Sequence, residues 1–224
     1  MNQTVKKGVG RPRASDKPAL MPAREDILKA SAELFAELGF KGTSTRKIAE
    51  RVGIRQPSLF HHFRKKEDIL TALVNEGGSS ILDYIERIDF EADPRVELYQ
   101  LMIFDFYFLM TEPLHVNAII GLPEVRNGPL KEVVDRERGR IINCYRQLIA
   151  KGADDNWFVV ADLEVAANST FGMGEALWSW YDRETGADPK VVAAQIADMA
   201  MRALLVKPSW LETVKKRAKL DVPD

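Results

Sequence analysis

The stretch TSTRKIAERVGIRQPSLFHHFRKK, residues 43–66, predicts two short helices joined by a tight turn. A hydroxyl at Ser44 or Thr45 can cap the first helix, because it accepts hydrogen bonds from N–H groups that lack a partner in the first turn. Gly53 is expected to end that helix, since glycine tolerates the positive φ found there. Pro57 lies near the start of the second helix, where its fixed φ and missing N–H cost least.

The second helix of this segment has an inward and an outward face. Leu59 and Phe63 are four residues apart and are expected to point into a small core. The outward face is polar and aromatic and consists of Arg55, Gln56, Ser58, Phe60 and His61. Amide, hydroxyl and guanidinium groups on an exposed helix can hydrogen-bond to base edges in the major groove of DNA. The segment therefore predicts a DNA-binding helix-turn-helix.

Residues 24–70 closely resemble the DNA-binding domain of the tetracycline-repressor (TetR) family. The resemblance is carried by LFAELGF (34–40), TRKIAERVGI (45–54) and LFHHFRKKE (59–67). It implies a ligand-responsive repressor that binds a palindromic operator as a homodimer and takes a small-molecule effector in a C-terminal helical domain. Two alternatives stay open: an architectural DNA-binding protein without an effector, and an enzyme housed in the C-terminal bundle. No nucleophile–base array or phosphate loop in the sequence favours the enzyme.

Roles at the DNA follow from residue chemistry and from this resemblance. Gln56 can bind adenine through two hydrogen bonds, and Arg46, where the family has a base-reading arginine, can bind guanine O6 and N7. Pro57 and Ser58 can touch a thymine methyl or a base edge. Phosphate contacts are expected from Thr45, Arg55, Phe60, His61, His62 and Lys66. Phe60 replaces the family's usual tyrosine, so the hydroxyl contact expected there is absent.

Charge is distributed unevenly along the 224 residues, although the net charge is −1. Residues 1–66 contain 15 Lys or Arg against 6 Asp or Glu, and the remainder contains 17 against 27. A basic N-terminal third is typical of a module that binds a polyanion. Residues 1–20 predict a disordered basic arm. Within it, Arg11 and Arg13 of Gly-Arg-Pro-Arg either enter a narrow minor groove or belong to a plain solvated tail.

The rest of the composition narrows the class of protein. Cys144 is the only cysteine, which excludes a disulfide within one chain and suits the reducing cytoplasm. The longest nearly apolar run, residues 101–110, is too short for a bilayer, which needs about 20 residues, so no membrane partner is predicted. No cofactor or metal is predicted, and adjacent histidines such as His61 and His62 face apart on a helix.

The sequence predicts an all-α fold with three parts: the arm at 1–20, a three-helix DNA-binding domain at 21–68, and a helical ligand-binding and dimerisation domain at 69–224. Helical periodicity marks further segments at 23–38, 66–75, 93–110, 130–150, 162–181, 189–206 and 209–219. In the first of these, the apolar stripe includes Leu38, which is expected in the core. The helix at 93–110 is apolar on all sides and is expected to be buried.

Two C-terminal helices are candidates for a dimer interface. Gly172 and Gly174 lie within the predicted helix at 162–181, where each costs about 1 kcal/mol against alanine. Such glycines let a second backbone come close, either within the chain or across an interface. Resemblance to the TetR family implies that this helix and the one at 189–206 pair with their copies as a four-helix bundle.

Aromatic residues, methionines and a few polar side chains suggest a ligand cavity, although such a stripe is also typical of core packing. The candidates are Met102, Phe104, Asp105, Phe108, His115, Met173 and Trp178. Asp105 stands out, because a carboxylate among apolar residues must be paired, protonated or exposed. It is expected to meet either a cationic or hydroxyl-bearing ligand or an internal arginine. His115 is more simply explained as a packing residue.

Overall fold

The computed structural model describes residues 24–114, 116–182, 186–220 and 222. Its helices are α1 (Arg24–Gly42), α2 (Thr45–Val52), α3 (Gln56–His62), α4 (Lys66–Gly77), α5 (Ser79–Ile85), α6 (Pro94–Thr111), α7 (Val116–Gly121), α8 (Pro123–Arg126), α9 (Lys131–Asp154), α10 (Leu163–Glu175), α11 (Leu177–Trp180), α12 (Pro189–Leu204), the 3₁₀ helix η1 (Pro208–Trp210) and α13 (Leu211–Arg217). The only β pairing within these residues is an isolated bridge between Phe158 and Leu205. The predicted all-α class is confirmed, and none of the described helices combines the length and apolarity that a membrane span needs.

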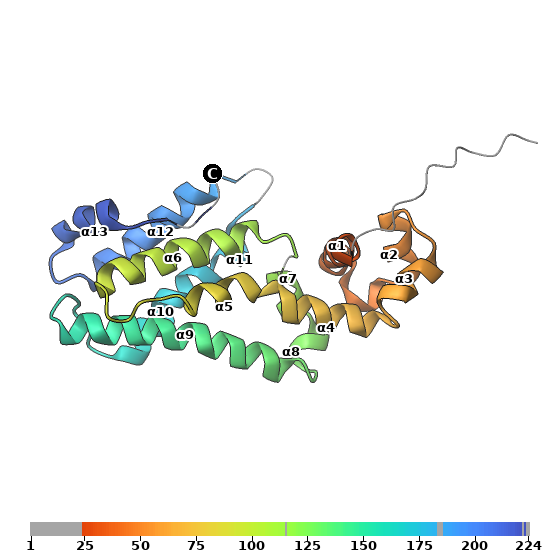
Figure 1. Ribbon diagram of the computed structural model, residues 1–224, viewed down its shortest axis with the longest axis horizontal. Coiled ribbons are helices and arrows are strands. Elements are labelled where there is room, and N and C mark those ends of the chain that lie inside the picture. Colours follow the sequence, from red (N-terminus) through yellow and green to blue (C-terminus); the bar gives the residue numbers. More distant parts are fainter. Residues whose placement is uncertain (1–23, 115, 183–185, 221, 223–224) are drawn as a thin grey trace, which may run out of the picture.

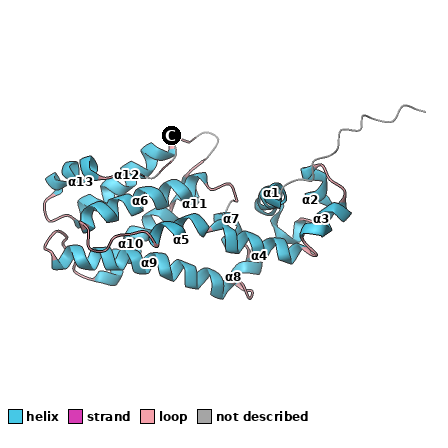
Figure 2. Ribbon diagram, in the orientation of Figure 1, coloured by secondary structure: helices cyan, strands magenta, loops and turns pink. Residues whose placement is uncertain are grey.

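The molecule is elongated, with α1–α3 at one end and a larger bundle at the other (Figure 1). Helix α4 extends from the small end toward the bundle, and α9 runs along the bundle's edge. Figure 2 shows that helices joined by loops make up the described chain throughout. The arrangement leaves α2 and α3 at the far tip, away from the bundle.

The N-terminal core is built from the apolar positions that the sequence pattern indicates. Ile27, Ile48 and Leu59 are fully buried in it. Leu38 is the exception, since 45% of it is exposed and the expectation that it packs in the core is wrong. Gly39 has φ 70° and turns the chain, so that Phe40 occupies the core instead.

Residues from much later in the chain complete this N-terminal core. Ile119 of α7, Leu122 just before α8 and Val125 of α8 are buried against it. Helix α7 packs on both α1 and α4. The apolar core around the helix-turn-helix thus continues into a segment that connects the two ends of the molecule.

Helix α6 lies at the centre of the C-terminal bundle. Asp93 caps its first turn by accepting a hydrogen bond from the N–H of Arg95, and Pro94 occupies the first helical position. Helices α9, α10 and α12 pack around it. The predicted burial of this apolar helix is confirmed, as Leu98, Leu101 and Phe106 have no exposed surface.

The helix predicted over 162–181 is interrupted. Helix α10 ends at Glu175, and the short α11 begins at Leu177. Ala176, between them, keeps helical angles of φ −61° and ψ −24°, so the interruption is local. It follows Gly172 and Gly174, and glycine weakens a helix.

Candidate nucleic-acid interface and ligand pocket

The turn between α2 and α3 has the predicted geometry. The Ser44 side chain accepts a hydrogen bond from the N–H of Lys47 at 3.2 Å and caps α2. Gly53 ends the helix in the left-handed region, with φ 79° and ψ 27°. The N–H of Ile54 then donates to the Ala49 carbonyl at 2.9 Å, which closes the turn. These local bonds fix how α3 leaves α2 and which of its faces points outward.

The predicted base-reading side chains lie around this turn. Arg46 has 79% of its side chain exposed, and its Nε donates to Glu50 at 2.8 Å on the same helix face. The amide nitrogen of Gln56 donates to the hydroxyl of Thr45 at 2.8 Å. Gln56 is half-buried by this contact, Ser58 is half-buried and Pro57 is exposed. Helix α2 therefore orients the Gln56 amide at the start of α3.

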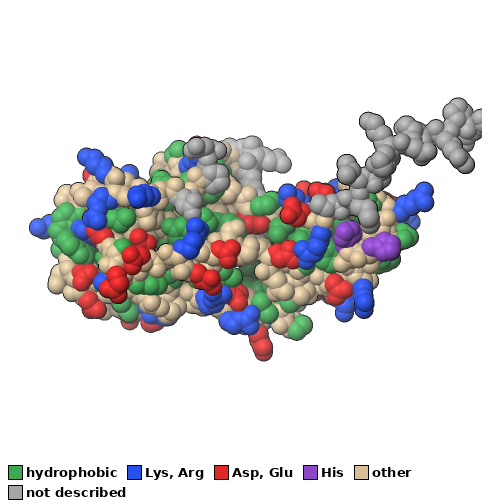
Figure 3. Space-filling view, in the orientation of Figure 1, with side chains coloured by type: hydrophobic (Ala, Val, Ile, Leu, Met, Phe, Trp, Pro, Cys, Tyr) green, Lys and Arg blue, Asp and Glu red, His purple; other side chains and the backbone are tan. Residues whose placement is uncertain are grey.

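The predicted phosphate-binding side chains differ in their exposure to solvent. Arg55 and His61 are exposed, and 43% of Phe60 is exposed. His62 is half-buried, and its Nε2 is buried without a hydrogen-bond partner among the described residues. Both described histidines and several Lys and Arg side chains appear at the helix-turn-helix end in Figure 3.

Lys66 is engaged within the protein. Its ammonium donates to the carbonyl oxygens of Phe40 at 2.5 Å and Thr43 at 2.7 Å. It also lies 4.1 Å from the centre of the Phe40 ring, a cation–π distance. Lys66 thus ties the first turn of α4 to the loop that presents α2.

Three predicted site residues lie outside the described residues. Arg11 and Arg13 belong to the predicted minor-groove arm, and His115 to the predicted ligand pocket. Their roles stay predictions.

A pocket of about 680 Å³ opens between the two ends of the molecule. Its walls come from α4, α5, α6, α7, α8, α9, α10 and α11. Val74 and Asn75 of α4 line it, as do Ile120 of α7 and Val125 of α8. A molecule bound here would touch helices that also pack in the N-terminal core.

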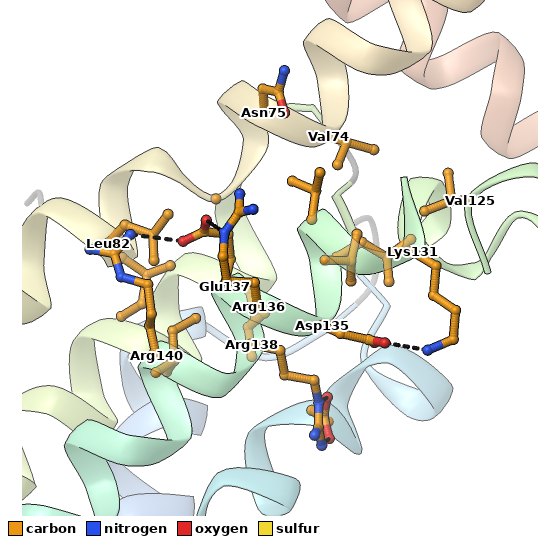
Figure 4. Close-up of a pocket in the computed structure, with 18 of the residues that line it drawn as sticks. Val74, Asn75, Leu82, Val125, Lys131, Asp135, Arg136, Glu137, Arg138 and Arg140 are labelled. Carbon is orange, nitrogen blue, oxygen red and sulfur yellow. Dashed lines mark hydrogen bonds and ion pairs between the residues drawn. The ribbon is translucent and has the colours of Figure 1, made fainter. Parts of the chain in front are cut away.

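Charged side chains of α9 form one rim of the pocket (Figure 4). Arg138 makes a two-bond pair with Glu175 of α10 at 2.9 and 2.8 Å. Arg136 and Arg140 both contact Glu137, and Lys131 pairs with Asp135. Sequence reasoning missed these residues, since such charges on an amphipathic helix resemble an ordinary solvated face. The only signal was their density between 131 and 140.

Of the residues predicted from sequence to form the pocket, Asp105, Phe108 and Trp178 line it. Met102 is fully buried in the core and Phe104 stacks on Tyr84 with ring centres 4.2 Å apart. Neither these two nor Met173 is part of the lining.

Asp105 is buried, with 2% of its surface exposed. The hydroxyl of Tyr145 on α9 donates to its Oδ2 at 2.7 Å, so the internal partner is a tyrosine and the expected arginine is wrong. Burial raises the pKa of Asp105 to about 7, and the nearby charge of Glu175 acts in the same direction. The Tyr145 hydrogen bond opposes that rise.

Helices α10 and α12 expose apolar and small side chains. On α10, 63% of Val165 is exposed, and a Cβ built on Gly172 would meet nothing within 4 Å. On α12, 65% of Met199 is exposed. Gly174 behaves differently, because a Cβ there would lie 2.5 Å from the Phe106 ring. Gly174 thus serves packing within the chain, and Gly172 leaves its outer face open.

The fold and these sites define the class: a helix-turn-helix protein whose outward helix is joined to a bundle with its own pocket. Residues 27–73 match the family model described as bacterial regulatory proteins, tetR family. Residues 100–204 match a second model, the tetracyclin repressor-like C-terminal domain. The two matches together span more than half of the chain. The chain belongs to the tetR family of bacterial regulatory proteins.

Individual relatives agree with this assignment. The chain is 47% identical over 47 residues to the class A tetracycline repressor of Escherichia coli, covering 21% of this chain and 22% of that protein. It therefore spans less than a quarter of the length of that curated relative.

Solved structures extend the likeness over most of the chain. The AmtR structure from Mycobacterium smegmatis is 29% identical with a TM-score of 0.71, covering 95% of this chain and all of that one. A structure of AibR with isovaleryl coenzyme A and operator DNA is 24% identical with a TM-score of 0.64, covering 83% and 98%. At that identity the AibR likeness concerns the fold alone.

Proposed function

We propose that the chain is a homodimeric, ligand-responsive repressor of transcription that binds a near-palindromic operator. The observation that carries this proposal is the α2–α3 turn, which presents Arg46 and Gln56 on the outside of a small basic module. Membership of a family of regulatory proteins supports it. The AibR structure, which is similar in fold, contains operator DNA and isovaleryl coenzyme A, so a protein of this architecture can hold both kinds of partner.

Base reading is assigned to the side chains at the start of the two helices. The Gln56 amide uses one N–H for Thr45 and keeps a second N–H and its oxygen for adenine N7 and N6. To bind guanine, Arg46 must break its ion pair with Glu50. The loss of stability is small, because exposed ion pairs contribute at most about 1 kcal/mol. Pro57 and Ser58 add contacts to a thymine methyl or a base edge.

Phosphate contacts fix the protein on the duplex without reading its sequence. Arg55 and His61, both exposed, are the best placed for this role. The remaining candidates are Thr45, Phe60, His62 and Lys66. For Lys66 we propose that contact with the phosphate comes in addition to its bonds inside the protein.

We assign residues 21–68 to DNA binding and 69–224 to ligand binding and dimerisation, with an arm at 1–20. An effector in the pocket would touch α4 and α7, both of which pack on α1. It would change operator affinity by its preference for one arrangement of these helices over the other. The exposed faces of α10 and α12 are the proposed dimer interface. A dimer is needed because each half-site of the operator binds one helix-turn-helix.

We infer that the bundle serves regulation and has no catalytic role. Membership of a regulatory family supports this inference. We propose that the protein binds DNA in the cytoplasm.

Selection of bound sequences from a random DNA pool by the full chain tests the proposal. We expect enrichment of a near-palindrome with half-sites about 10 base pairs apart or slightly more. The logarithm of the binding constant should fall linearly with that of salt concentration, with a slope of about −0.9 for each phosphate contacted. Binding without any enriched sequence would favour the architectural alternative, and the absence of DNA binding would overturn the proposal.

A further inference from the structure

Asp105 is a buried carboxyl group that accepts a hydrogen bond from one described side chain. It lines the pocket, and Tyr145 donates to its Oδ2. No described side chain donates to Oδ1. A carboxylate offers about four acceptor positions, so Asp105 can accept further hydrogen bonds from a molecule in the pocket. An amide would accept the same Tyr145 bond without burying an ionisable group, so packing alone does not explain an acid here.

All but one of the other charged side chains in the same walls are already paired. On α9, Lys131, Arg136, Arg138 and Arg140 all have carboxylate partners. Glu175 of α10 is held by Arg138. Among the described charged residues that line the pocket from α6, α9 and α10, Asp105 alone has an uncharged partner. The remaining charged liner, Arg126 of α8, is exposed.

Aromatic rings line the same pocket as Asp105. Phe108, Phe171 and Trp178 line the pocket with apolar residues such as Ile81 and Leu109. The faces of aromatic rings carry negative potential and attract cations. Phe171 already receives the Arg138 guanidinium at 5.1 Å from its ring centre. The walls therefore suit an apolar molecule whose positive group lies close to a carboxylate.

We propose that the pocket binds an apolar ligand carrying a protonated amine, and that Asp105 accepts a hydrogen bond from that ammonium group. The cavity of about 680 Å³ has the volume of sites for drug-sized molecules. The proposal rests on the effector site of the proposed function and names the chemical class of the effector. Trp178, which lines the pocket and is 41% exposed, would cover the apolar part of the ligand.

Three probes that differ only in their polar group test this assignment: phenylbutylamine, phenylbutanol and phenylbutyrate. Their binding to the full chain, without DNA, is measured by isothermal titration calorimetry at about pH 8, where Asp105 is mostly ionised. We expect the amine to bind at least about tenfold more tightly than the alcohol or the carboxylate, a difference of about 1.4 kcal/mol.

Variants assign this preference to Asp105. Asp105→Asn should bring the three affinities within about threefold of one another. Glu97→Gln removes a carboxylate from the same helix but outside this pocket, and it should keep the full preference for the amine. Trp178→Ala, at an exposed position, should weaken all three probes and leave their order unchanged. Thermal unfolding of each variant shows whether it is folded.

Three results would overturn the proposal: equal binding of the three probes, no binding of the amine at millimolar concentration, or an amine preference that survives Asp105→Asn. If Asp105→Asn does not fold, an unchanged order of affinities in Trp178→Ala and Glu97→Gln, with the amine tightest, still supports it. The calorimetry uses no DNA, so failure of the wild-type chain to bind a selected operator would overturn the repressor proposal and leave this result standing.

Discussion

Asp105 links the folding of the bundle to pH. Its pKa is about 7 in the folded chain against an ordinary value of 3.8, mainly because it is buried. Folding therefore favours the protonated group, and the stabilisation it gives is complete below pH 4 and is lost as the pH rises to about 7. We expect Asp105→Asn to remove up to about 4 kcal/mol of pH-dependence from the free energy of unfolding, measured by urea denaturation from about pH 4 to 8.

The titration also depends on the groups that face Asp105. These are Tyr145 from α9 and Glu175 from α10, with Arg138 paired to Glu175. Asp83→Asn makes the same chemical change at an exposed position on α5 and serves as the control, expected to leave the wild-type pH curve in place. A pH-dependence in Asp105→Asn as steep as in the wild type would contradict this account.

Single residues also show how far sequence reasoning reaches. Asp105 was identifiable because a carboxylate in an apolar helix is rare. Its partner Tyr145 was not, because the two lie 40 positions apart on different helices. The local motif marked Gln56 and Arg46 as base-reading candidates, and this role stays a prediction. The bond from Gln56 to Thr45 was not predictable, because it depends on how α3 leaves the turn.

Among the elements, the loop between α1 and α2 depends on Lys66 of α4. Its ammonium satisfies the Phe40 and Thr43 carbonyls, and a hydrogen bond to a charged group contributes about 1.5–3 kcal/mol. We expect Lys66→Met to lower the thermal stability of the chain and to weaken DNA binding to all sequences alike. Differential scanning calorimetry and gel shifts with matched and unrelated DNA measure the two effects.

Lys65→Met provides the comparison for stability. Lys65 is exposed, adjacent in sequence and identical in charge, and its backbone N–H keeps its bond to Asp68 in the variant. Equal stability of the two variants would show that the bonds of Lys66 contribute nothing measurable.

The faces of α10 and α12 carry the dimerisation proposal. Met199 and Val159 are each 65% exposed in the single chain, so a charge at either position should leave the fold intact. We expect Met199→Glu, on α12, to weaken the dimer at least about tenfold by burying a charge in the interface. Val159→Glu, outside both helices, should remain dimeric. Size-exclusion chromatography with light scattering at several protein concentrations measures the oligomeric state. A Met199→Glu dimer as tight as the wild-type dimer would contradict the proposed interface.

Element boundaries were predictable where local chemistry sets them. Ser44 and Gly53 bound α2, and Asp93 caps α6, as short-range rules require. Two features were not predictable from periodicity. Leu38 continues the apolar stripe of α1, yet it is 45% exposed beside the turn at Gly39. The interruption at Ala176 was the second, and the packing of Gly174 against Phe106 beside it is a contact between distant segments.

In the whole molecule, α1 lies between the helices that line the pocket and the DNA-binding helices α2 and α3. Residues of α4 and α7 line the pocket, and both helices pack on α1. The sequence indicated the two ends of the molecule through its charge asymmetry and its motif. It did not indicate that Ile119, Leu122 and Val125 would join the N-terminal core, because that contact depends on how the chain returns from the end of α6.

The central claim is that the outward face of α2 and α3 reads DNA bases. The most direct measurement compares wild type, Gln56→Ala and Arg46→Ala on a selected operator and on its single-base variants. We expect each substitution to weaken operator binding by about 1–3 kcal/mol. Each should abolish discrimination between bases at one base pair per half-site and leave discrimination at the other base pairs unchanged. Unchanged discrimination at every position in both variants would contradict the claim.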